Sequence, residues 1–238
     1  MNPVVLHNRL AAAALAAALA VAAATACLRL AQQPRFDFRR IEVQSALRHV
    51  DRNTLRRAIA GRLAGNFFTM RMADARAAFE AIPWVASASV RRVWPDRLVV
   101  RLAERHAIGV WSDGRVLSDN GVLFEGNPGE AELDGAAIEF SGPPEMAAQS
   151  VHMLAVCDAA LASLGTRVAA LDVSDRASWT VRTAAGQVLE LGRDEPAGAV
   201  AARLASVAAS YPAVLAQLAG QPAHIDARYD NGFAAARP

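Results

Sequence analysis

The side chains that could do covalent, acid–base or metal chemistry are spread along the chain without catalytic spacing. The sequence contains no G-x-S-x-G, H-E-x-x-H, G-x-G-x-x-G or C-x-x-C motif and no Walker phosphate-binding loop. The histidines fall in different predicted elements at no metal-ligand spacing: His7, His49, His106, His152 and His224. We therefore predict a protein that is not an enzyme and has no metal, cofactor or small-molecule substrate.

The two cysteines are not expected to form an internal disulfide. Cys27 lies within an apolar N-terminal run, where it cannot easily meet a partner in a folded domain. Cys157 is surrounded in sequence by apolar residues, among them Leu154 and Leu161. We expect Cys157 to be a small buried side chain and not a reactive thiol.

The charge balance excludes nucleic acid as the main partner. The chain has 25 Lys+Arg against 23 Asp+Glu, a net charge of +2, and all of its cationic side chains are arginine. Nucleic-acid binding requires a concentrated basic face, whereas these arginines are scattered through all the predicted elements. The exclusive use of arginine is more typical of genomic base composition than of a phosphate-binding surface.

A pair of aromatic residues near the C-terminus is the best candidate for binding. A last strand is predicted to begin at His224 and to include Tyr229 and Phe233. The two aromatic residues are four positions apart, so in an extended strand both rings point to one face, which either packs on the domain or contacts a partner. Because a terminal edge strand has unpaired backbone donors and acceptors, a partner peptide can add to it as a further strand.

An uncharged apolar segment occupies the N-terminal part of the chain. Residues 10–28 carry no charge over 19 positions and are rich in alanine and leucine. At about 1.5 Å per residue, such a helix is long enough to cross the hydrocarbon core of a bilayer. We predict a transmembrane helix at 10–30, after a short cytoplasmic tail at 1–9 and before a linker at 31–38.

Two alternatives to a retained helix stay open in the sequence. Arg9 and Ala24-Thr25-Ala26 are also typical of a cleaved signal peptide, and cleavage there would leave Cys27 first, as in a lipoprotein. The charges oppose the positive-inside tendency, because four arginines follow the segment by position 40 and one precedes it. Long folded domains nevertheless translocate largely regardless of charge, so we expect the C-terminal part outside the cytoplasm.

Residues 39–105 are predicted to form a small β-α-α-β-β domain. Ile41 and Val43 alternate with polar neighbours in the first strand and are expected to point inward. Asp51 is a good N-cap for a helix that continues through Leu63 to a stop at Gly65-Asn66.

The second half of this domain is predicted to be a helix and a hairpin. The helix covers 73–82, and strands at 84–94 and 98–103 are joined by Pro95-Asp96. Trp84 and Trp94 are expected to pack between the sheet and the helices.

Residues 106–238 are predicted to form a β-rich domain with helical insertions, which makes the fold class α+β. Asp113-Gly114 and Asn120-Gly121 separate three short strands of an antiparallel meander. The other predicted elements are a helix at 144–164, strands at 168–173, 179–183 and 188–191, a helix at 197–211 and the strand from 224.

Several of these segments resemble the FtsQ/DivIB family of bacterial cell division proteins. Ile41-Glu42-Val43 is similar to the first strand of the family's POTRA domain, and the run from Pro83 to Leu98, with Glu104 and Trp111 beyond it, resembles the family's hallmark. In the second domain the matching stretches are Asp119–Phe124, Trp179, Gly186, Leu189–Arg193 and Ile225–Gly232. Each stretch is short, but they occur in the family's order behind an apolar helix.

The resemblance implies a non-enzymatic scaffold, anchored in the inner membrane at the division septum with its C-terminal domains in the periplasm. The POTRA domain would take part in recruitment to the division site. The β domain would bind the division proteins FtsB and FtsL and other divisome components, and through them the protein would regulate septal wall synthesis. By similarity, the partner-binding surface comprises Arg176, Arg228, Tyr229, Asn231, Gly232 and Phe233. Strand addition would supply affinity, and the arginines would meet acidic partner side chains.

Two other functional classes fit the sequence less well. A POTRA-containing secretion or outer-membrane assembly factor would carry several POTRA units or the alternating strands of a β-barrel, and the sequence has neither pattern. A periplasmic hydrolase would require a site outside the known catalytic motifs.

Overall fold

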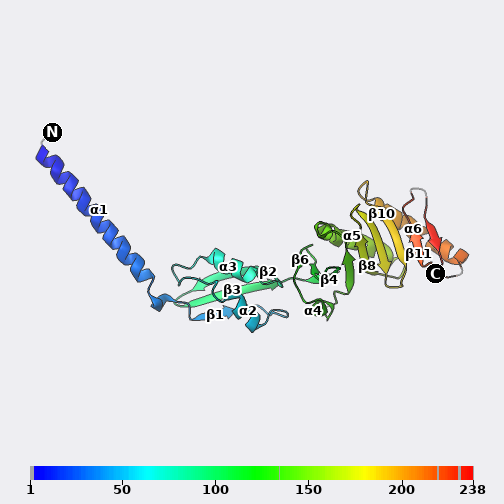
Figure 1. The fold of residues 1–238 in the computed structure, drawn as a ribbon, viewed down its shortest axis with the longest axis horizontal. Helices are drawn as coiled ribbons and strands as arrows, with labels where there is room; N and C mark the ends of the chain where they lie inside the picture. Colours follow the sequence, from blue (N-terminus) through cyan, green and yellow to red (C-terminus); the bar gives the residue numbers. More distant parts are fainter. Residues whose placement is uncertain (1–2, 134, 219, 230–231, 238) are drawn as a thin grey trace. The chain divides into compact units, whose positions relative to one another are not determined.

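The chain divides into two compact units, the first ending at Glu104 and the second beginning at Arg105. The structure is a computed structural model that describes residues 3–133, 135–218, 220–229 and 232–237 (Figure 1). Each unit has its own sheet and its own buried side chains. The fold is α+β, as the sequence predicts.

The first element is the long apolar helix α1, Pro3–Ala31. Within it, residues 11–31 are long and apolar enough to cross a membrane, and all of the side chains from 11 to 30 are exposed. The hydroxyl of Thr25 donates to the carbonyl of Val21 at 2.9 Å, so the helix satisfies this polar group internally. A short 3-10 helix, Pro34–Phe36, follows.

The remaining elements of unit 1 have the predicted order β-α-α-β-β. They are β1 Arg40–Val43, α2 Arg52–Ile59, α3 Met72–Glu80, β2 Val85–Val93 and β3 Arg97–Glu104. The sheet order is β1-β3-β2, with β1 parallel and β2 antiparallel to β3. Asp51 is confirmed as the N-cap of α2, because its side chain accepts from the Thr54 amide at 2.6 Å.

Three predictions for unit 1 are wrong in detail. Helix α2 ends at Ile59, before Leu63, where the chain turns through Gly61 at φ +72°. Ile41 is 42 % exposed, since β1 is an edge strand and α3 packs over β2 at the other edge. Trp94 is 61 % exposed because it lies in the β2–β3 turn, beyond the paired strands, whereas Trp84 is buried as predicted.

Unit 2 contains a nine-stranded sheet within the described residues, in the order β12-β11-β10-β9-β8-β7-β4-β5-β6. The strands are β4 Ala107–Trp111, β5 Val116–Ser118, β6 Leu123–Phe124, β7 Ile138–Ser141, β8 Val168–Val173, β9 Ser178–Thr183, β10 Val188–Arg193, β11 His224–Asp226 and β12 Ala234–Ala236. The predicted meander is present as β4-β5-β6. Strand β7 and the short helix α4, Pro128–Leu133, were not predicted.

Two longer helices, α5 (Ala147–Ala162) and α6 (Ala199–Leu218), pack on each other and on the sheet. Although α6 is also long and apolar enough to span a membrane, its buried residues belong to the core of unit 2. Helix α6 continues past its predicted end at Tyr211 and through Pro212. Tyr211 is buried, and its hydroxyl accepts from the Gln187 side-chain amide at 2.6 Å, which holds this turn of the helix against the domain.

Cys157 is confirmed as a buried side chain of α5. Burial raises the pKa of its thiol to about 12, so the reactive thiolate is not populated at neutral pH.

Candidate partner-binding site

The candidate site is at one end of the unit 2 sheet. Strands β8 and β9 are antiparallel, β9 and β10 are antiparallel, and β10 and β11 are parallel. The carboxyl ends of β8, β10 and β11 therefore lie at the same end of the sheet. This topology places Arg176, in the β8–β9 turn, and Arg228, after β11, at the same end of the sheet, although the sequence separates them by 52 positions.

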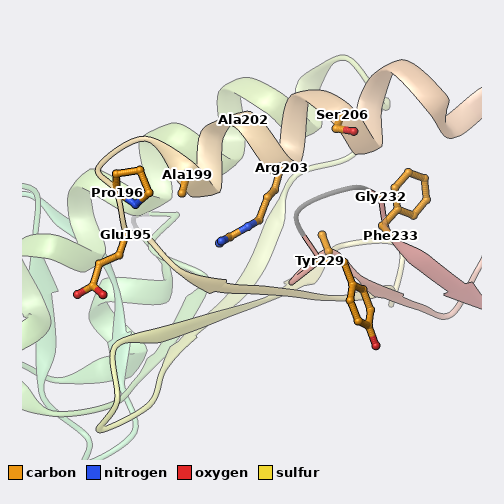
Figure 2. Close-up of a pocket in the computed structure, with 10 residues that line it drawn as sticks. Glu195, Pro196, Ala199, Ala202, Arg203, Ser206, Tyr229, Gly232 and Phe233 are labelled. Atoms are coloured by element: carbon orange, nitrogen blue, oxygen red, sulfur yellow. The ribbon is translucent and has the colours of Figure 1, made fainter.

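A pocket of about 240 Å³ lies between the first turns of α6 and the segment that follows β11 (Figure 2). Its lining residues are Glu195, Pro196, Ala199, Ala202, Arg203, Ser206, Ala227, Tyr229, Gly232 and Phe233. Three of these, Tyr229, Gly232 and Phe233, belong to the predicted surface. The pocket is too small for a drug-sized ligand and fits part of one or two side chains.

Arg228 is bound to carboxylates of its own chain. Its guanidinium donates to both oxygens of Asp226, at 2.8 and 2.6 Å, and lies 3.0 Å from Glu190. The second oxygen of Glu190 is 3.0 Å from the His224 ring. The hydrogen bonds from Arg228 hold the pKa of the Asp226 carboxyl below its usual range, and Asp226 in turn raises the pKa of Arg228.

A second arginine, Arg203 of α6, attaches the helix to the end of β10. Its Nη1 donates to the carbonyls of Leu191 and Arg193 at 2.8 and 2.7 Å. Between them, Gly192 has φ +73°, and a Cβ there would lie 3.3 Å from the Arg228 side chain and 3.4 Å from Arg203 Nη1. Glycine therefore fits both the backbone conformation and the close approach of the two arginines.

The two aromatic residues do not share a strand, contrary to the sequence prediction. Strand β11 ends at Asp226 and β12 begins at Ala234, antiparallel to it, so the chain reverses direction in the segment that contains Tyr229 and Phe233. The Tyr229 ring points away from α6, whereas the Phe233 ring lies on the α6 side (Figure 2). Tyr229 is 60 % exposed, but Phe233 is half-buried and packs against the core.

The other predicted residues are placed as follows. Arg176 is exposed in its turn, and Gly232 is exposed at the pocket. Asn231 lies outside the described residues. Arg203 and the α6 residues at the pocket were not predicted, because the sequence shows only that they are helical and not which strand end the helix approaches.

The described residues of this site offer contacts for a polypeptide. No cluster of three metal-ligating side chains occurs among the described residues. The edge of the sheet at this side is β12, whose outer backbone groups can pair with an added strand. An exposed tyrosine, a shallow pocket and an edge strand together suit a peptide segment of another protein.

Comparisons with known proteins cover both units. The family described as "POTRA domain, FtsQ-type" matches residues 36–105, and "Cell division protein FtsQ/DivIB, C-terminal" matches residues 109–228. The chain is 37 % identical to the cell division protein FtsQ of Burkholderia pseudomallei, over 95 % of this chain and 90 % of that protein. It is 35 % identical to FtsQ of Bordetella pertussis, over 96 % and 88 %.

Proposed function

The chain belongs to the FtsQ/DivIB family of bacterial cell division proteins, and from this we propose that it is a membrane-anchored, non-enzymatic scaffold that binds FtsB and FtsL and regulates septal wall synthesis. In this proposal α1 stays in the inner membrane, and the POTRA domain (39–105) and the β domain (106–238) lie in the periplasm at the septum. The match of residues 109–228 to the FtsQ/DivIB C-terminal family favours a division protein over a secretion or outer-membrane assembly factor.

The observation that carries the proposal is the coincidence of the edge strand β12 with an exposed Tyr229 at the same end of the sheet. An added strand of FtsB would hydrogen-bond to β12 and bring its side chains over the segment that leads from β11 to β12. Tyr229 would provide a rigid aromatic contact at low cost in conformational entropy. Phe233 would serve mainly to hold this segment on the core.

The arginines have different roles in this proposal. Arg176 is exposed and is proposed to contact an acidic partner side chain directly. Arg228 already binds Asp226 and Glu190, so its first role is to fix the end of β11 beside β10. Its side chain is nevertheless 54 % exposed, which leaves room for a partner carboxylate beside these two.

The test is a titration of the full chain in detergent micelles with an FtsB fragment. Tyr229→Ala should weaken binding by about 2 kcal/mol, in the range of interface hot spots. Phe233→Ala should lose both affinity and stability, because its ring packs on the core. Leu133→Ala, which truncates an 89 % exposed side chain of α4, is the matched control and should leave binding unchanged.

Thermal melts of each variant separate binding from folding. Wild-type affinity in Tyr229→Ala with an unchanged melt would exclude this surface as the binding site. Lost affinity with an equally large loss of stability would instead make Tyr229 a structural residue. No binding of the wild-type chain at any concentration would contradict the assignment of FtsB as the partner.

A further inference from the structure

Unit 1 has a cluster of aromatic side chains at its surface, comprising Phe36, Phe38, Phe67, Phe68 and Trp94, here called the aromatic patch. The rings contact one another in a chain: Phe36–Phe68 at 4.9 Å, Phe67–Trp94 at 5.4 Å and Phe38–Phe67 at 5.9 Å between centroids. Phe68 is 51 % exposed and Trp94 is 61 % exposed. Large apolar side chains that gather on a surface mark a contact with a partner or a membrane.

The core of unit 1 does not use the most exposed members of this patch. Phe79, Val85 and Leu98 are fully buried, and Trp84 is buried against His49, with ring centroids 3.8 Å apart. The segments that carry the patch are instead tied to each other, since the Phe67 amide donates to the Phe36 carbonyl at 2.9 Å. The patch is therefore a built surface, held together by backbone contacts.

Asn66 connects the patch to the end of α1. Its buried side-chain amide donates to the carbonyl of Ala31, the last residue of α1, at 2.7 Å. Its Oδ1 accepts from the amides of Phe68 and Thr69, at 3.1 and 3.2 Å, and so shapes the turn that presents Phe67 and Phe68. One side chain thus satisfies a terminal helix carbonyl and fixes the aromatic turn beside it.

The position of Ala31 sets the depth of the patch when α1 spans a bilayer. The uncharged run ends at Leu28, three residues before Ala31, which is a rise of about 4.5 Å. The headgroup region on each side of the hydrocarbon core is about 5–8 Å thick. A turn that is hydrogen-bonded to Ala31 therefore lies within that region, where tryptophan and other aromatic rings are favoured.

The charges beside the patch suit phospholipid headgroups. Arg35 lies over the Phe36 ring, 5.0 Å from its centroid. Arg29 is in the last turn of α1, and the Arg39 and Arg40 amides donate to the Asp96 carbonyl in the turn that contains Trp94. These are the arginines whose position after the apolar run opposes the positive-inside tendency, and lipid phosphates give them a partner on this side.

We propose that the aromatic patch inserts into the headgroup region of the membrane that carries α1, with the neighbouring arginines on lipid phosphates. The inference rests on the proposed function only in that α1 must be retained as a membrane helix. The patch then holds unit 1 against the bilayer, so the POTRA domain is not a freely swinging domain on a flexible tether. Its occupant is the lipid surface, and the partner site of unit 2 plays no part in it.

The experiment is fluorescence quenching of the full chain reconstituted into vesicles of phosphatidylcholine and phosphatidylglycerol, brominated near the carbonyl end of the acyl chain. Trp84, Trp111 and Trp179 are buried, so Trp94 is the tryptophan that such lipids can reach. Brominated vesicles should reduce the emission of the wild-type chain, and Trp94→Phe should lose this reduction.

Two further variants, both made in the Trp94→Phe background, place the fluorescent tryptophan at other positions of unit 1. Phe68→Trp stays within the patch and should restore quenching. Ser87→Trp is the matched control, because this exposed residue lies near the opposite end of β2, about 24 Å from Trp94 along the strand. It should not be quenched.

Extraction with alkaline carbonate distinguishes a failure of the membrane anchor from a failure of the patch to insert. Suppose that the chain resists extraction. Equal quenching of the wild type and Trp94→Phe, or no quenching of Phe68→Trp, would then contradict the insertion of the patch, while α1 would still be a membrane anchor. Quenching of Ser87→Trp as strong as that of Phe68→Trp would also contradict the proposal, because unit 1 would then contact lipid with no preference for the aromatic patch. Release of the chain by carbonate would refute the anchor and the patch together.

Discussion

Both units bury aromatic side chains, but unit 1 also gathers several large rings on its surface. In unit 2, Trp111, Phe140 and Trp179 are all buried, and the Trp111 and Phe140 rings are parallel with centroids 6.1 Å apart. In unit 1, Trp94 and Phe68 are mostly exposed. Trp111, Phe140 and Trp179 therefore hold unit 2 together from inside, whereas Trp94 and Phe68 form an outer surface on unit 1 beside a core that buries Phe79 and Trp84. Truncation of a buried and of an exposed ring should show which of them stabilise their unit.

The largest expected effect is at Trp111. Its ring is buried and its Nε1 donates to the Gly142 carbonyl at 3.1 Å, so Trp111→Ala should cost about 3–5 kcal/mol of stability in unit 2. Trp94→Ala, at an exposed turn, removes the ring contact with Phe67 and should cost about 1 kcal/mol or less in unit 1. Hydrogen exchange followed by mass spectrometry measures both units separately in the full chain. A large loss in unit 1 from Trp94→Ala would place Trp94 in the core and remove the contrast.

An intermediate effect is expected at Glu104, which stabilises unit 1 through polar contacts. Its carboxylate accepts from the backbone amides of Arg48, His49 and Val50 at 2.9, 3.0 and 2.9 Å. Glu104→Ala removes this acceptor from three amides and should cost about 2–3 kcal/mol in unit 1. Glu104→Gln keeps the shape without the charge and should cost less. The same exchange experiment should show unit 2 unchanged, and an equal loss in both units would mean that they do not unfold independently.

The third expected effect, smaller than the one at Glu104, is the pH dependence at Asp226 of unit 2. Because Arg228 lowers the pKa of this carboxyl in the folded state, its stabilisation is fully present above the ordinary value of 3.8 and is lost as pH falls through the lower folded value. Asp226→Asn should lower the free energy of unfolding by up to about 1 kcal/mol at neutral pH, and the stability of the variant should depend less on pH in the acid range. Urea titrations between neutral pH and pH 3 measure the difference. Identical acid sensitivity in the wild type and the variant would exclude this pair as its cause.

Predictions that rest on short stretches of sequence agree with the structure. Asp51 caps α2, Cys157 is buried and the strand at 168–173 has the predicted bounds. Each of these depends on a side chain and its near neighbours, or on a run of apolar residues. Strand β12 was missed because it is three alanines, a residue type that is depleted in strands and forms this one only by pairing with β11.

The candidate site was predicted only in part, since its members are brought together by strand order. A sequence resemblance pointed to Arg228 and Tyr229, but it did not show that the chain reverses between β11 and β12 or that Tyr229 and Phe233 differ in burial. Arg203 joins the site because α6 crosses the end of β10, a contact that no local pattern specifies.

The sequence by itself determined the apolar helix, the order of most elements, the family and the absence of the known catalytic motifs, because these depend on composition, periodicity and short motifs. The tertiary structure decided which side chains are exposed. Whether Ile41 or Trp94 is covered depends on where the helices lie on the sheet. The aromatic patch forms because long-range hydrogen bonds of Asn66 and Phe67 join their turn to the end of α1 and to the segment of Phe36. Burial is a property of long-range packing, and a residue's type sets only how much it gains from being buried.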